Sequence, residues 1–208
     1  LSKFTQAEHR IPLLSLSNAM NSKELELFHT QMVKGLEEED IEYVGEPKLD
    51  GLAVELIYEN GKFMKGSTRG NGYVGEDITE NLKTINAIPL SLNSDYIIPK
   101  ILEVRGEVFI NHHDFLELNK KRLNDGESVF ANPRNCAAGS LRQLDSSVTA
   151  MRPLRIFCYA PGYIEGITIN SQKEFLDLLP KWGLPVNSEI QIGHGINFLN
   201  SYYQYIES

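Results

Sequence analysis

A lysine flanked by two acids stands just ahead of a turn signal, in the stretch Glu46-Pro47-Lys48-Leu49-Asp50-Gly51. Successive side chains of an extended chain alternate between faces, so Glu46, Lys48 and Asp50 are predicted to share one face. We interpret Lys48 as a nucleophile that forms a covalent bond to phosphorus. The alternative is a solvated lysine between two surface acids, which the motif alone favours because short motifs match by chance.

The charges around Lys48 oppose that chemistry. A lysine attacks phosphorus only as the neutral amine, whereas carboxylates on the same face stabilise its ammonium form. Glu46 and Asp50 therefore cannot be what activates it. We expect a positive group to offset them: Arg69, Arg142, a divalent ion or a lysine outside this chain.

A hairpin behind the motif is predicted to bring an arginine to it. Asn60-Gly61 indicates a two-residue type I′ turn, which needs positive φ at both central positions. Counted outward from that turn without interruption, Thr68 faces Ala53 and Arg69 faces Leu52. The hairpin is therefore predicted to return Arg69 to the side of the lysine turn.

Two further stretches carry polar groups that suit a ligand. The loop 69–75 holds three glycines, so its amides are either free to bind anionic oxygens or part of a plain turn. The predicted strand 101–110 places Glu103, Arg105 and Glu107 on one face, as a surface ladder or as the wall of a polar site.

Composition describes an ordinary globular protein of 208 residues, with 41% hydrophobic and 23% charged residues. A net charge of -8 argues against a domain that grips nucleic acid over its whole surface, but leaves room for a local basic groove. The cysteines, Cys136 and Cys158, are predicted to be reduced thiols, and the five histidines to be structural or surface residues. No membrane span or secretory signal is predicted, and the start at Leu1 indicates a piece of a longer protein.

Periodicity and capping signals give the remaining elements. Asn132-Pro133 begins a predicted helix that holds Arg134 and Arg142, which lie roughly 80° apart around a regular helix. Helices are also predicted over about 22–38, 76–86, 111–122, 171–181 and 195–207, and strands or extended segments over 42–49, 52–59, 62–68, 101–110, 154–160 and 186–192.

Four stretches taken together are more specific than any one of them: EPKLDG (46–51), TRGNGYVGEDI (68–78), EVRGEVF (103–109) and ANPRNCAAGSLRQLD (131–145). With Leu14-Ser15-Leu16 upstream, and FCY (157–159) and KWGLP (181–185) downstream, the chain closely resembles the adenylation domain of bacterial NAD-dependent DNA ligases over nearly its whole length. The fourth stretch separates this family from ATP-dependent ligases and capping enzymes, which share K-x-D-G.

The resemblance implies an α+β nucleotidyltransferase fold, with antiparallel sheets flanked by helices, and an enzyme of DNA replication and repair. A lysine of that family attacks the α-phosphate of NAD, releases nicotinamide mononucleotide and holds AMP, which passes to the 5′-phosphate of a DNA nick. Mg²⁺ is the expected ion. Carried over by position, Lys48 matches the nucleophile, Asp50 a polar partner in the pocket, and Arg134 and Arg142 arginines that serve the phosphates and the nick. The nucleotide-contacting positions are matched by Ser15, Leu16, Glu46, Leu49, Arg69, Glu107 (suited to the ribose hydroxyl) and Tyr159 (stacked on adenine).

The resemblance also implies that 1–208 is a partial domain. It lacks the N-terminal module for nicotinamide mononucleotide, the C-terminal lysine motifs, the OB-fold and later domains, so we expect it to bind adenine nucleotide but to react poorly alone. The expected setting is the bacterial cytoplasm, and the expected partner is nicked double-stranded DNA, bound by a monomer without membrane contact. Two alternatives stay open: a non-catalytic nucleotide-binding scaffold, and an ATP- or GTP-using relative, against which the 131–145 stretch argues.

Overall fold

A computed structural model describes residues 4–207 and divides the chain into two compact units. The first unit comprises Leu1–Leu13 and Leu49–Val186, and the second comprises Leu14–Lys48 and Asn187–Ser208. In the described part of the chain all paired strands are antiparallel. Helices accompany the sheets in both units, so the predicted α+β class is confirmed.

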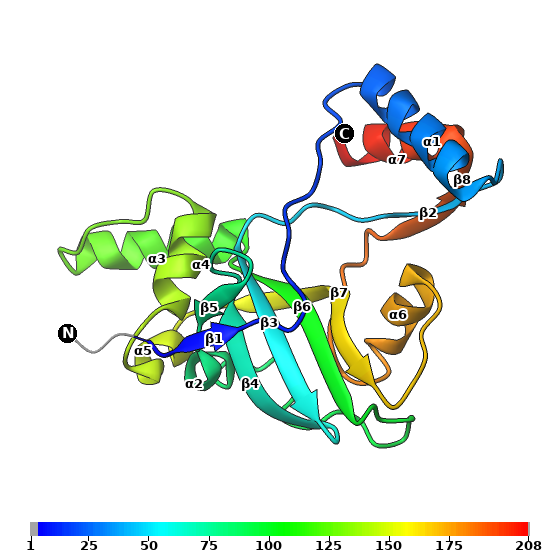
Figure 1. Cartoon of the computed structure of the whole chain (residues 1–208). Coiled ribbons are helices and arrows are strands. Elements are labelled where there is room, and N and C mark those ends of the chain that lie inside the picture. Colours follow the sequence, from blue (N-terminus) through cyan, green and yellow to red (C-terminus); the bar gives the residue numbers. More distant parts are fainter. Residues whose placement is uncertain (1–3, 208) are drawn as a thin grey trace. The chain divides into compact units, whose positions relative to one another are not determined.

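The first unit is built on a four-stranded sheet in the order β4-β3-β6-β7 (Figure 1). Its strands are β3 (Leu52–Glu59), β4 (Lys62–Thr68), β6 (Ile101–Phe109) and β7 (Arg155–Glu165). A smaller pair joins β1 (Gln6–Glu8) to β5 (Val74–Glu76). The helices are α2 (Thr79–Leu82), α3 (His112–Asn124), α4 (Pro133–Leu141), α5 (Ser146–Ala150) and α6 (Gln172–Leu178).

The two faces of this sheet differ in chemistry. Side chains of one face, such as Val54, Leu56, Val104 and Val108, are fully buried in the core. The opposite face carries Glu55, Glu103, Arg105 and Glu107, as the alternation of the strands predicts. The candidate site is built on that second, polar face.

The second unit pairs β2 (Glu42–Gly45) with β8 (Gln191–His194), and α1 (Ser22–Leu36) packs against α7 (Gly195–Glu207) (Figure 1). Asn21 caps α1 by accepting a hydrogen bond from the Glu24 amide. No residue of α1 or α7 is buried, although Ile41, next to β2, is.

The predicted hairpin register is right near the turn and wrong beyond it. Asn60 and Gly61 both have positive φ, and Glu59 pairs with Lys62 as expected. The register then shifts between Ile57 and Tyr58, because Met64 occupies a β-bulge without an opposite residue. Thr68 consequently faces Val54 rather than Ala53, and the Arg69 amide bonds the carbonyl of Ala53 at 2.9 Å.

Several predicted boundaries also need correction. The strand expected over 42–49 ends at Gly45, since Pro47 offers no amide hydrogen and β8 provides only four paired residues. The side chains of 46–50 therefore do not follow a paired strand. The helix after Asn132 ends at Leu141, so Arg142 is its C-cap with φ −94° and the helical angle between the two arginines does not apply. The helix expected over 76–86 is only the four-residue α2.

Candidate active site

Gly51, the last residue of the lysine motif, is packed directly against β6. Its amide donates to Oε1 of Glu107 at 3.0 Å, across 56 positions of the chain. A Cβ added at Gly51 would lie 2.1 Å from the carbonyl oxygen of Val108, so a larger residue does not fit this backbone position. Glycine thus lets the motif approach the sheet and present an amide to a carboxylate.

Asp50 pairs with an arginine from the fourth motif. Its Oδ1 lies 3.0 Å from Nη1 of Arg134, on the first turn of α4. Both side chains are largely exposed, at 71% and 61% of their full areas, so the pair contributes little to stability. The guanidinium lies close enough to offset the charge of Asp50, and the predicted effect of that acid on Lys48 stays a prediction.

The remaining residues of this motif lie on both sides of the boundary between the units. Lys48 is exposed and ends the second unit's first segment, whereas Leu49 is half-buried and begins the first unit's main segment. Glu46 is half-buried in the second unit near Tyr202, whose pKa is raised to about 12 by burial and, to a smaller extent, by carboxylates including Glu46. The predicted neighbourhood of Lys48 and Arg69, which belong to different units, stays a prediction.

Ser15 and Leu16 are exposed residues of the second unit, and Leu16 has 80% of its area accessible. They follow a segment that crosses the polar sheet face of the first unit and ends at Leu13. Their predicted role in nucleotide contact stays a prediction.

Tyr159 lies where β7 is irregular. Arg105 pairs with Ala160 and Gly106 with Cys158, so Tyr159 is the extra residue of a bulge. Bulges re-aim a side chain, and this one lies within reach of three charges on the polar face. The pKa of Tyr159 is raised to about 12, mainly by burial and to a smaller extent by the Glu107 carboxylate, against the lowering effect of the guanidinium groups of Arg105 and Arg69. The structure thus brings Tyr159, Glu107 and Arg69 into one electrostatic neighbourhood.

Arg69 is anchored by backbone groups. Its Nε donates to the carbonyl oxygen of Leu13 at 2.9 Å. The glycine-rich loop that follows uses its own amides: Gly72 donates to the Arg69 carbonyl, and Tyr73 and Val74 donate to the side chain of Asn71. These three amides are therefore engaged within the loop, which favours the plain-turn alternative for this part of it.

Arg142 and Arg134 form ion pairs with different acids. Nη1 of Arg142 is 3.5 Å from Oε2 of Glu76 on β5, and both side chains are about half exposed. The structure therefore groups Asp50, Gly51, Glu107 and Arg134, while Arg142 belongs to a separate ion pair.

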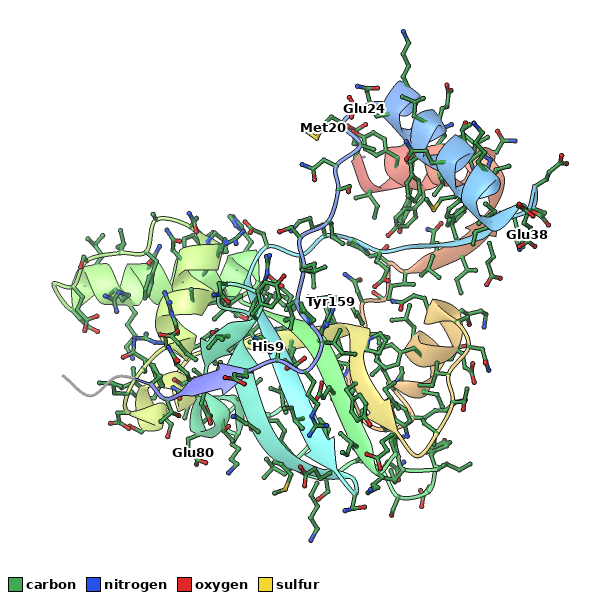
Figure 2. The ribbon with its side chains drawn as sticks, in the orientation of Figure 1. His9, Met20, Glu24, Glu38, Glu80 and Tyr159 are labelled. Atoms are coloured by element: carbon green, nitrogen blue, oxygen red, sulfur yellow. The ribbon has the colours of Figure 1, made fainter. Side chains whose placement is uncertain are left out.

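The sequence did not indicate a buried polar cluster beneath the segment after β1. His9, predicted to be structural or on the surface, has a fully buried side chain 2.7 Å from Glu55 (Figure 2). Glu55 and Glu103 are 1% and 0% exposed, which is rare for acids. Their position within apolar strands was the available signal, because a buried acid needs a polar partner.

No group of three or more His, Cys, Asp or Glu side chains within residues 4–207 is arranged to hold a metal ion. The expected Mg²⁺ therefore has no such cluster of ligands in the described part of the chain. Within the same range, none of the helices has both the length and the apolar character needed to cross a membrane.

Comparisons with known proteins agree over the whole chain. A family model described as "NAD-dependent DNA ligase adenylation domain" matches residues 1–208. The DNA ligase of Geotalea uraniireducens is 54% identical over 206 residues, which cover 98% of this chain and 30% of that protein. The DNA ligase of Coprothermobacter proteolyticus is 49% identical over 185 residues, covering 89% of this chain and 28% of that protein. The chain thus spans about 30% of the length of the first of these relatives.

Proposed function

Because this chain belongs to the NAD-dependent DNA ligase adenylation domain family, we propose that it carries out the adenylate-transfer step of DNA joining, with Lys48 as the nucleophile. The supporting observation is the hydrogen bond from the Gly51 amide to the Glu107 carboxylate, which holds the end of the lysine motif on the polar sheet face. That face also holds Tyr159 and Arg69, an aromatic ring and a cation of the kinds that suit adenine and phosphate.

In the proposed step the neutral amine of Lys48 attacks the adenylyl phosphorus of NAD. A phosphorus–nitrogen bond forms, the bond from phosphorus to the bridging oxygen breaks, and nicotinamide mononucleotide leaves with that electron pair. The proton released from the lysine nitrogen passes to solvent. Most of the rate enhancement would come from positioning and charge stabilisation, as in phosphoryl transfer generally.

The other residues have distinct proposed roles. Glu107, oriented by the Gly51 amide, accepts a hydrogen bond from the ribose hydroxyl, and Tyr159 stacks on adenine. Arg69 serves the phosphate. Ser15, Leu16, Glu46 and Leu49 complete the nucleotide contacts.

The two arginines of the fourth motif are assigned to the phosphates and the nick. Arg134 is held by Asp50, so its guanidinium is partly oriented before any ligand binds. Arg142 is held by Glu76 and would serve a different phosphate.

We further propose that AMP passes to the 5′-phosphate of nicked double-stranded DNA in a monomeric enzyme of the bacterial cytoplasm. Mg²⁺, when bound, would supply positive charge that offsets the phosphates. These later steps depend on segments beyond this chain, which we propose to be a module for nicotinamide mononucleotide, the C-terminal lysine motifs, an OB-fold and later domains.

The test is adduct formation with NAD labelled in its adenylate half. We expect the 208-residue chain to bind AMP but to form little adduct, and the chain joined to the flanking family segments to form lysyl-AMP at Lys48. Lys48→Ala is expected to abolish the adduct, whereas the matched variant Lys62→Ala, at an exposed strand position, is expected to retain it.

Two outcomes contradict parts of this proposal. Efficient adduct formation by the 208-residue chain alone would show that the flanking segments matter less than proposed. Equal AMP affinity of wild type and Lys48→Ala, with no adduct even after the segments are joined, would favour a non-catalytic nucleotide-binding scaffold.

A further inference from the structure

The polar face of the four-stranded sheet carries a buried charged cluster that the proposed reaction does not use. Glu55 on β3 and Glu103 on β6 are 1% and 0% exposed. Residues 9–13, the segment after β1 that carries His9 in Figure 2, contact Glu55 through His9 and Glu103 through Arg10, and we call them the covering segment. Burying charges is unfavourable unless each has a partner, and the covering segment supplies one partner to each acid, while Glu103 also accepts a hydrogen bond from the Tyr163 amide at 3.1 Å.

His9 is the buried end of the covering segment. Its Nδ1 is 2.7 Å from Oε2 of Glu55, and its Nε2 is 3.2 Å from the carbonyl oxygen of Arg69. A carbonyl oxygen can only accept, so Nε2 must carry the hydrogen of that bond. One further proton is then shared between Nδ1 and Glu55, on one side of that bond or the other. In either arrangement Glu55 fixes the ring so that Nε2–H points at Arg69.

The other end of the covering segment holds the side chain of the same arginine. Leu13 accepts from Nε of Arg69 at 2.9 Å, and its own amide donates to the carbonyl of Gly72 at 2.8 Å. Between the two ends, Nη2 of Arg105 donates to the carbonyls of Ile11 and Pro12, each at 3.0 Å. The covering segment therefore contacts Arg69 twice, once at its backbone and once at its guanidinium.

We propose that His9 is a positioning residue for Arg69, acting through the hydrogen bond from Nε2 to the Arg69 carbonyl. This inference rests on the proposed function, in which Arg69 serves the phosphate of the nucleotide. A guanidinium is planar, so fixing its Nε and its backbone also fixes the direction in which its two terminal nitrogens point. His9 touches no substrate in this scheme, and its effect on nucleotide binding passes entirely through Arg69.

A purely structural role of His9 predicts a different experimental result. If His9 only neutralised Glu55 and fastened the covering segment, its loss would lower the free energy of unfolding without depending on Arg69. A double-mutant cycle separates the two roles, because residues that act through one another show non-additive effects.

The experiment measures the dissociation constant of AMP by titration calorimetry on the full 208-residue chain. Asn at position 9 places its amide nitrogen near the position of Nδ1 and keeps the contact with Glu55, but does not reach the Arg69 carbonyl. Gln places its amide nitrogen near the position of Nε2 and keeps that contact. We expect His9→Asn to weaken AMP binding about tenfold and His9→Gln to stay within about threefold of wild type. His113→Asn, at an 85% exposed side chain on α3, is the matched control and is expected to have no effect.

The same substitutions are then made in an Arg69→Ala background, where His9→Asn is expected to change AMP binding by less than about twofold. Fluorescence of the buried Trp182 verifies that each variant is folded. An equal loss from His9→Asn in both backgrounds, or no loss in either, overturns the inference and leaves the proposed function standing. No loss from Arg69→Ala itself overturns the inference together with the proposed role of Arg69 at the phosphate, while Lys48 as the nucleophile is tested separately by adduct formation. No AMP binding by the folded wild-type chain overturns both the inference and the proposed function.

Discussion

Substituting Gly51 by alanine tests whether the lysine motif is seated on β6 as described. The added Cβ would lie 2.1 Å from the Val108 carbonyl oxygen, against 3.4 Å where ordinary contacts begin, a shortfall of about 1.3 Å. Both partners are backbone, so no side-chain rotation relieves the clash. Moving the Gly51 backbone away also removes its amide from Glu107. Overpacking and a lost hydrogen bond to a carboxylate together give about 3 kcal/mol of destabilisation.

The assay is urea unfolding followed by fluorescence of Trp182, which belongs to the same unit and is fully buried. With a slope of about 2 kcal/mol/M, the expected loss lowers the midpoint by about 1.5 M. AMP affinity is expected to fall about tenfold, because Glu107 loses the amide that orients it.

Gly126→Ala is the matched control in the same unit. Gly126 has φ of +72° with no atom within 4 Å of an added Cβ, so it tests backbone strain without a clash. We expect about 1 kcal/mol of destabilisation and unchanged AMP affinity. A Gly51→Ala variant within about 0.5 kcal/mol of wild type, a typical surface effect, would refute the packing of the motif on β6.

Charge reversal at the exposed ion pair, Asp50→Arg with Arg134→Asp, is expected to change the free energy of unfolding by less than about 1 kcal/mol. Either single reversal is expected to lower adduct formation in the chain joined to its flanking segments. A large loss of stability in urea unfolding would contradict this. Burial raises the pKa of Glu103 above its ordinary value of 4.5. The stability that the protonated carboxyl contributes is therefore complete below about pH 4.5 and is lost as the pH rises through the folded-state pKa. Glu103→Gln is expected to flatten that part of the plot of urea midpoint against pH. An unchanged plot would be evidence against a raised pKa of Glu103. Burial raises the pKa of Cys158 to about 12 and also raises that of Cys136, so neither thiol is expected to react with a disulfide reagent at pH 8 until urea unfolds the chain; labelling of the native protein counts against this.

Short sequence signals predicted the turns and helix starts that depend on only a few neighbouring residues. The Asn60-Gly61 turn requires positive φ at two positions, and the Asn132-Pro133 start of α4 combines a cap with a residue preformed for the first turn. The Met64 bulge was not predictable in this way, because the alternating pattern of that strand is compatible with both registers. Strands β1 and β5 are three residues each and pair across the chain, which leaves no periodic signal.

In the candidate site, too, the residue types could be predicted from the sequence, whereas the long-range contacts could not. The lysine, acids and arginines of the four motifs could be recognised from the sequence as residues that suit nucleotide chemistry. The structure adds the hydrogen bond from Gly51 to Glu107 and the ion pair of Asp50 with Arg134. The contact between His9 and Glu55 spans 46 positions and depends on the covering segment lying over the sheet. Sequence spacing cannot indicate such a contact, because nothing near His9 in the chain shows which strand it will meet.

The bulge in the β3–β4 hairpin has a consequence for changes in chain length. Met64 has no opposite residue, while Thr68 faces Val54 and Glu59 faces Lys62. A chain lacking Met64 would keep both of those pairs in an unbroken ladder and leave Arg69 at the end of the same strand. Deletion of a single residue usually turns the rest of a strand onto its other face. Here a deletion is expected to be tolerated in mid-strand, because the residues that follow would keep their faces and leave the polar sheet face intact.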